Sequence, residues 1–110
     1  MKSGAQRRGD TGRPMAEYRF TSRAAMDLEA IAEYTIERFG IDQARRYRDE
    51  LAACFEQLVH HPGLGRRSEQ LGSGLRRYEH RSHIVFYQVV GTGILIVRIL
   101  HSRMDVRLHF

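Results

Sequence analysis

The stretch Gly74–Asp105, GLRRYEHRSHIVFYQVVGTGILIVRILHSRMD, contains the two most apolar runs of the chain, Ile84–Val90 and Ile94–Leu100. Both runs are rich in Ile, Val, Phe and Tyr, which fit a pleated and buried surface. The link Val90–Gly93 holds two glycines, which take positive φ without strain, so the runs predict an antiparallel hairpin. Leu75–His80 predicts a third strand just upstream. We therefore expect a sheet of central strands, covered by helices on at least one face.

The segment before this sheet predicts a strand followed by a helix. Glu17–Thr21 alternates polar and apolar residues as a half-buried strand does, and Ser22 offers an N-cap hydroxyl. Across Arg23–Phe39 an apolar and a polar face separate at helical spacing, and Gly40 is expected to end the helix. The apolar face comprises Leu28, Ile31, Ala32, Thr35 and Phe39, and the polar face comprises Asp27, Glu29, Glu33, Glu37 and Arg38.

A second helix is predicted to follow at once, with Asp42 as its N-cap and Pro62 after its end. Its apolar residues recur at the spacing of a narrow packing seam. The seam comprises Ala44, Tyr47, Leu51, Cys54 and Leu58, with Phe55 beside it. A link as short as Gly40–Asp42 predicts an antiparallel helical hairpin. The seam position of Cys54 favours a core residue over a nucleophile.

The order of these elements is strand, helix, helix and then three strands. It predicts an α+β fold, with the helical hairpin packed on one face of a mostly antiparallel, about four-stranded twisted sheet. Residues 15–110 are expected to form one domain, because a chain of 110 residues is too short for two. Met1–Pro14 is rich in Gly, Ser and Arg and predicts a disordered basic leader. Gly63–Gly74 is expected to be a loop.

The net charge of +5 is distributed unevenly along the chain. Met15–Gly65 holds six arginines against nine acidic residues, whereas Arg66–Phe110 holds eight arginines against three acidic residues. A basic sheet half indicates an anionic partner, such as a phosphate or an acidic protein segment. The alternative is that these arginines only solvate an exposed face.

Several classes of protein do not fit the sequence. No run approaches the roughly 20 apolar residues that a membrane-spanning helix needs, and the N-terminus lacks the apolar core of a signal peptide. The single cysteine allows neither an internal disulfide nor metal-site spacing. We expect a cytoplasmic protein without a metal or cofactor. No P-loop, GxSxG elbow or dinucleotide fingerprint is present.

Polar residues on the predicted strands could serve a ribonuclease, which needs a general base, a general acid and a cation for the phosphate. Glu79, His101 and Arg77 or Arg98 would supply these groups. Strand alternation argues against this site, because it places Arg98 and His101 on opposite faces. Arg98 is expected beside Ile94 and Ile96, and His101 beside Leu95, Val97 and Ile99. Tyr87 is interpreted as a core residue whose hydroxyl finds a partner.

The segments DLEAIAEYTIERFG, QARRY, HPGLGRR, GLRRYEHRSHIVFY and VRILHSRMD, in this order, resemble the ParE branch of the RelE/ParE toxin superfamily. The resemblance runs from about Tyr18 to Leu108. Its most specific parts are Gly65-Arg66, Gly74-Leu75-Arg76, Phe86-Tyr87, Val97–His101 and Arg103–Asp105. The ILHxRMD ending and the absence of lysine from the expected domain are more similar to ParE than to the RelE-like nucleases.

The resemblance implies a bacterial toxin of a type II toxin–antitoxin module that inhibits DNA gyrase, is not an enzyme, and blocks replication. It also implies neutralisation by a ParD-like antitoxin, which has a DNA-binding ribbon–helix–helix part and a flexible, often acidic C-terminal segment. The toxin would meet DNA only through this antitoxin. Two alternatives are a RelE-like mRNA endonuclease that uses Arg77, Glu79 and His101, and a decayed toxin that only binds its antitoxin.

Two surfaces follow from this hypothesis. Near the end of the last strand we expect target contacts from Arg98, His101, Arg103 and Met104. For the antitoxin we expect an apolar helix against the helical hairpin and an extended acidic segment along the sheet. The residues predicted to contact the antitoxin are Tyr47, Phe55, Arg76, Arg77 and Arg81.

Overall fold

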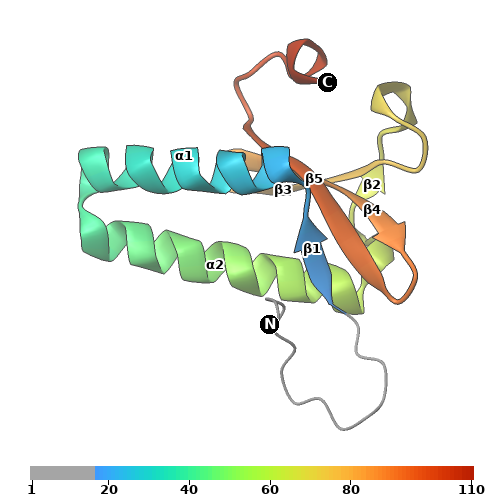
Figure 1. Ribbon diagram of the computed structural model, residues 1–110, viewed down its shortest axis with the longest axis horizontal. Helices are drawn as coiled ribbons and strands as arrows, with labels where there is room; N and C mark the ends of the chain where they lie inside the picture. The colour runs from blue at the N-terminus through green and yellow to red at the C-terminus, as the bar shows by residue number, and fades with distance from the viewer. Residues whose placement is uncertain (1–16) are drawn as a thin grey trace, which may run out of the picture.

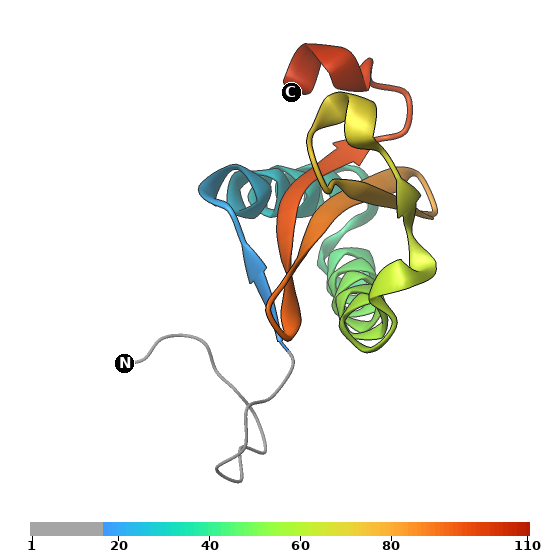
Figure 2. The same ribbon diagram turned by 90° about the vertical axis from the view of Figure 1, so that its right-hand side faces the viewer.

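Five strands form one sheet in the computed structural model, which describes residues 17–110 (Figures 1 and 2). The strands are β1 (Tyr18–Phe20), β2 (Arg66–Arg67), β3 (Arg76–His80), β4 (His83–Val90) and β5 (Gly93–His101), in the spatial order β1-β5-β4-β3-β2. β1 runs parallel to β5, and the other pairs are antiparallel. The predicted α+β order is confirmed. The additional strand is β2, which lies inside the segment predicted to be a loop, and the predicted leader Met1–Pro14 lies outside the described residues.

The predicted helical hairpin consists of α1 (Ser22–Phe39) and α2 (Ile41–His60), which are joined by Gly40 alone. Gly40 has a φ of 92°, in the left-handed region that favours glycine, and its N–H donates to the carbonyl of Ile36. Both predicted N-caps are wrong. The hydroxyl of Thr21, one residue before Ser22, accepts from the Ala24 N–H, and α2 starts directly after Gly40, so that Asp42 lies inside its first turn.

The linked ends of the two helices extend beyond the sheet (Figure 1). Ala24 is the only fully buried residue of α1, and Phe39, predicted on the buried face, is 63% exposed. The prediction was wrong for Phe39 because the sheet does not reach this end of the helix. Neither α1 nor α2, in the part of the chain that is described, is long and apolar enough to span a membrane.

Apolar side chains cover both faces of the sheet. On the face toward the helices, called here the helix-side face, the core comprises Ala24, Leu51, Cys54, Phe55, Leu58, Val59, Val85, Tyr87, Ile94, Ile96 and Ile99. On the opposite, outer face, a smaller cluster comprises Leu75, Ile84, Phe86 and Leu100, against which Leu71, Val97 and Val106 pack. Cys54 is buried as predicted, and burial raises the pKa of its thiol to about 11, which keeps it protonated and unreactive.

A β-bulge changes the phase of β5. Tyr87 pairs with Ile96 but Phe86 pairs with Arg98, so β5 has one more residue than β4 at this point. Beyond the bulge, Arg98 lies opposite Phe86 on the outer face, and Ile99 returns to the helix-side core. The predicted grouping of Arg98 with Ile94 and Ile96 is therefore wrong. Arg98 and His101 still lie on opposite faces, because the bulge shifts both by one position.

Tyr87 fixes the loop that follows α2 to the sheet. Its side chain is fully buried, its hydroxyl donates to the carbonyl of Pro62 at 2.7 Å, and it accepts from the Gly65 N–H at 2.9 Å. A Cβ on Gly65 would lie 2.6 Å from this hydroxyl, so only glycine allows the close approach. The prediction that Tyr87 is a core residue with a partnered hydroxyl is confirmed.

Replacing Tyr87 by Phe is expected to destabilise the fold by about 1–3 kcal/mol, because the change leaves the Pro62 carbonyl and the Gly65 N–H without their partner. Urea titration of the free energy of unfolding measures the effect. Tyr34→Phe, at an exposed position of α1, is the matched control and should change the free energy by less than about 0.5 kcal/mol. Equal effects of the two variants would contradict the role given to the Tyr87 hydroxyl.

Candidate functional site

Three histidines gather where the ends of β3, β4 and β5 meet α2. They are His80, His83 and His101, and with Tyr47 and Glu50 of α2 they form what we call the histidine corner. The Tyr47 hydroxyl lies 2.7 Å from Nδ1 of His83. The rings of His83 and His101 meet edge to face with centroids 5.4 Å apart. The pairing of His80 with His83 and of His83 with His101 follows from the strand registers.

Two half-buried side chains of the histidine corner, His83 and Tyr47, are uncharged at neutral pH. Burial, with smaller effects of His101 and His80, lowers the pKa of His83 to about 4, so its imidazole is neutral. Burial also raises the pKa of the Tyr47 phenol. The short contact between these two side chains is therefore a hydrogen bond between neutral groups.

The rim of the histidine corner is charged. Arg81 donates to both carboxylate oxygens of Glu50, at 2.7 and 3.2 Å, and this hydrogen bonding lowers the pKa of Glu50. His80 Nε2 lies 3.5 Å from a Glu50 oxygen but makes no hydrogen bond. The Arg81 side chain is 64% exposed, so this pair is solvated and contributes little to stability.

The segment after β5 adds exposed groups to the same corner. The Ser102 N–H donates to the carbonyl of Ser82, and the Arg103 N–H donates to Nδ1 of His101 at 3.1 Å. Arg103 is exposed, and Met104 is 45% exposed. The structure thus brings together residues that the sequence assigned to two different surfaces. His101 and Arg103 were predicted to contact the target, and Tyr47 and Arg81 to contact the antitoxin.

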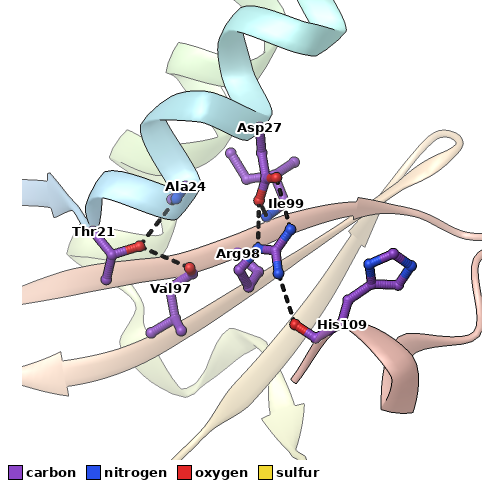
Figure 3. A network of polar contacts seen from close by, with 7 residues as sticks. All are labelled: Thr21, Ala24, Asp27, Val97, Arg98, Ile99 and His109. Atoms are coloured by element: carbon purple, nitrogen blue, oxygen red, sulfur yellow. Dashed lines mark hydrogen bonds and ion pairs between the residues drawn. The ribbon is translucent and has the colours of Figure 1, made fainter.

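Arg98, the fourth predicted target contact, lies in a different environment (Figure 3). Its Nε and Nη2 donate to the two carboxylate oxygens of Asp27 at 2.8 and 2.9 Å, and its Nη1 donates to the carbonyl of His109 at 2.7 Å. The hydrogen bonds that Arg98 donates to Asp27 raise the pKa of its guanidinium, and Arg98 is only 9% exposed. Every terminal nitrogen of Arg98 is hydrogen-bonded inside the protein, so this side chain is not available to a target and has a structural role.

The remaining residues predicted to contact the antitoxin lie apart from the histidine corner. The Phe55 ring is 3% exposed and packs on Tyr18 and Phe20 of β1, so it belongs to the core and not to a free surface. Arg76 donates to the carbonyl of Gly65 on the helix-side face. Arg77 lies on the outer face, with its guanidinium over the ring of Phe86. Of these three, only the arginines can reach a partner.

The three residues of the alternative nuclease site are not brought together. Arg77 and Glu79 pair with Phe86 and Ile84, and therefore lie on the outer face. His101 lies on the opposite face, two strands away, beside His83. One phosphate could not contact all three side chains. The corner itself offers hydrogen-bonding and cationic groups suited to binding a macromolecular surface.

Sequence analysis did not predict the roles of two acidic residues, Asp27 and Glu50, which bind Arg98 and Arg81. Asp27 was placed on the exposed face of the first helix, yet it binds Arg98 and also accepts from the Ile99 N–H. Its position four residues before Ile31 puts it at the border of the apolar face, which is the signal that could have identified it. Glu50 lies four residues before the buried Cys54, so it too is at the border of the apolar face of its helix.

Comparison with known proteins identifies the relatives of the chain. Residues 18–106, from β1 to the segment after β5, match the sequence model of a family described as the ParE toxin of the type II toxin–antitoxin system parDE. The chain belongs to the ParE toxin family. It is 43% identical over 95 residues to Toxin ParE1 of Caulobacter vibrioides, which covers 86% of this chain and 98% of that toxin. The identity to Toxin ParE1 of Mycobacterium tuberculosis is 37% over 92 residues, covering 83% and 94%.

A solved structure supports the same assignment. The structure described as the chromosomal ParDE TA system from P. aeruginosa superposes with a TM-score of 0.67 at 28% identity, covering 81% of this chain and 98% of that chain. The predicted fold class and the predicted ParE relationship are confirmed. This protein is a ParE toxin of a type II toxin–antitoxin system.

Removing the carboxylate of Asp27 is expected to destabilise this ParE toxin strongly. Asp27→Ala leaves the buried Arg98 guanidinium without a counter-charge, which typically costs about 3–5 kcal/mol, measured by urea titration. Glu29→Ala removes an exposed carboxylate of the same helix and should cost less than about 0.5 kcal/mol. The double variant Asp27→Ala, Arg98→Met should recover part of the loss. If it is no more stable than Asp27→Ala, the unpaired charge is not the cause.

Acid is expected to destabilise the fold through His83. The folded-state pKa of about 4 lies below the ordinary value of 6.5, so between these pH values the unfolded chain binds more protons than the folded chain. The contribution of the neutral His83 to the free energy of unfolding is complete above about pH 6.5 and is lost as the pH falls toward 4. Between pH 4.5 and 6 the free energy of unfolding of the wild type should therefore fall more steeply than that of His83→Gln, by up to about 1.4 kcal/mol per pH unit. The exposed His60→Gln should keep the wild-type slope, and a wild-type slope in His83→Gln would contradict the assignment.

Proposed function

We propose that this ParE toxin inhibits DNA gyrase in the cytoplasm by binding it, without catalysing a reaction, and that it thereby blocks replication. The observation that carries the non-enzymatic part is the separation of Arg77 and Glu79 from His101 on opposite faces of the sheet. An acid, a base and a cation must surround one phosphate to cleave RNA, and these residues do not. Membership of the ParE family favours gyrase as the target.

The proposed target surface is the exposed part of the histidine corner, at the end of β5. It consists of His101, Arg103 and Met104. Arg98, the fourth residue predicted to contact the target, is excluded because its side chain is bound to Asp27. Arg103 is an exposed cation, and the next residue, Met104, carries an exposed thioether, a flexible apolar group suited to irregular protein surfaces. A charged group next to an exposed apolar group is a common composition for a protein interface.

A ParD-like antitoxin is the second proposed partner. The tip of the helical hairpin exposes four large apolar side chains, Tyr34, Ile36, Phe39 and Ile41. Apolar residues gathered on one part of a soluble protein indicate a binding surface, and an amphipathic helix is the element that fits a helical hairpin. The arginines of β2 and β3 offer a complementary surface to an extended acidic segment. The toxin would meet DNA only through the ribbon–helix–helix part of such an antitoxin.

The double variant Arg103→Ala, Met104→Ala is expected to need at least about tenfold more protein to inhibit gyrase, the loss that corresponds to about 1.4 kcal/mol of binding free energy. The measurement is a supercoiling assay with purified gyrase, scored by the linear DNA that is released on denaturation. Arg19→Ala removes an exposed arginine from β1 and should inhibit like the wild type.

A different outcome would support the nuclease alternative. Primer extension on cellular transcripts after induction of the toxin would then show discrete new 5′ ends, and His101→Ala would abolish them. That result, together with no effect of the wild type on gyrase, would overturn the proposal.

A further inference from the structure

The turn that follows β5 carries two residues of the proposed target surface, Arg103 and Met104, and three successive backbone N–H groups hold it. The Ser102 N–H donates to the carbonyl of Ser82, in the turn between β3 and β4, at 2.8 Å. The Met104 N–H donates to the carbonyl of His101 at 3.0 Å. Between them, the Arg103 N–H donates to a side chain, Nδ1 of His101, at 3.1 Å. The backbone of the turn is thus attached to the sheet, while the side chains of Arg103 and Met104 are exposed.

The contact with Nδ1 fixes the chemical state of the His101 imidazole. A backbone N–H can only donate, so Nδ1 is the acceptor and does not carry a proton. The neutral ring then carries its proton on Nε2, and a doubly protonated ring could not make this contact. A side-chain acceptor bound to the N–H two residues further on is the arrangement with which Asn and Asp stabilise turns. His101 therefore has the role of a turn-forming residue in this structure.

Two further side chains hold the ring of His101 in place. His83 lies opposite His101 in the strand register, and their rings meet edge to face. The ring of His83 is held in turn by Tyr47, whose hydroxyl lies 2.7 Å from Nδ1 of His83 and whose ring centroid lies 5.5 Å from that of His83. Tyr47 belongs to α2, which packs on the helix-side core. A row of three side chains therefore extends from the helix, across β4, to the turn after β5.

These contacts explain the gathered histidines, which do not form a metal site. Within residues 17–110, no three side chains of His, Cys, Asp or Glu are grouped so that they could hold a metal ion. Burial lowers the pKa of His83 to about 4, so at neutral pH this ring supports its neighbour as an uncharged aromatic group. Of the two nitrogens of His101, Nδ1 is used inside the toxin and only Nε2 is left for a partner.

We propose that His101 is a positioning residue, whose Nδ1 holds the backbone of Arg103 and thereby fixes the direction of the Arg103 and Met104 side chains. Tyr47 and His83 take part by orienting the His101 ring. A turn that is held in one conformation before binding loses less freedom when the target binds, which strengthens the complex. The inference rests on the proposed target surface, and it gives a role to side chains of the histidine corner that need not touch the target.

Two substitutions of His101 separate the functions of its ring nitrogens. In His101→Asn the side-chain oxygen is two bonds from Cβ, as Nδ1 is, so it can accept from the Arg103 N–H. In His101→Gln the amide group is three bonds from Cβ, as Nε2 is, so it replaces Nε2 and not Nδ1. In the gyrase supercoiling assay, His101→Gln should need at least about tenfold more protein than His101→Asn for the same inhibition. A direct contact through Nε2 requires the opposite order, so equal inhibition by the two variants, or stronger inhibition by His101→Gln, would overturn the proposal.

Amide hydrogen exchange of the free toxin tests the same contact without a target. The Arg103 amide should exchange at least about tenfold faster in His101→Gln than in His101→Asn, because only the Asn variant keeps an acceptor for this N–H. The Val85 amide, on the central strand β4, should exchange alike in both variants, which shows that the fold is unchanged. Equal protection of the Arg103 amide in the two variants would overturn the role given to Nδ1.

A more distant variant tests the row of side chains behind the turn. Tyr47→Phe removes the hydroxyl that holds His83, and it should accelerate exchange of the Arg103 amide relative to the wild type. The exposed His60→Gln is the control and should exchange as the wild type does. An unchanged Arg103 amide in Tyr47→Phe would remove Tyr47 and His83 from the proposal. If the wild type does not inhibit gyrase, the proposed function fails, and exchange of the Arg103 amide still decides whether Nδ1 holds the turn.

Discussion

The carboxylate of Asp27 joins α1 to the edge of β5, and the arrangement of the other elements depends on this junction. β1 covers only Ile94–Ile96, so the rest of that edge would be bare. The Thr21 hydroxyl donates to the carbonyl of Val97, and the Asp27 carboxylate accepts from the Ile99 N–H and from Arg98 (Figure 3). The first two turns of α1 thus continue the edge that β1 begins. Because Arg98 also binds the carbonyl of His109, the same group ties the C-terminal segment to the outer face.

The bulge in β5 decides which residues are available for function. Without the extra residue, Arg98 would face the helices beside Ile94 and Ile96, in a core that leaves no place for a guanidinium. With it, Arg98 reaches Asp27 around the edge of the sheet, and His101 turns toward His83 and Tyr47. One local irregularity therefore creates both the structural ion pair and the histidine corner.

Much of this architecture could be predicted because apolar periodicity is a local property. The seam from Ala44 to Leu58 and the two runs beside Gly91 each specify their own element, and the seam position of Cys54 was sufficient to place it in the core. The features that could not be predicted depend on distant residues. The buried position of Arg98 requires Asp27, 71 residues earlier, and the two-residue β2 carries no pattern of its own. The prediction of which β5 residues share a face failed beyond the bulge, because nothing in the sequence from Ile94 to His101 marks the extra residue.

The parallel pairing of β1 with β5 also has a consequence for biosynthesis. Thr21 and Val97 are hydrogen-bonded although they are 76 residues apart, so the first strand has no partner until the last one has left the ribosome. The contacts between α1 and α2 join residues that are close in sequence, whereas pairings between distant strands form slowly. During translation the sheet therefore stays incomplete, and the helices can bury their apolar faces only when the last strand is available.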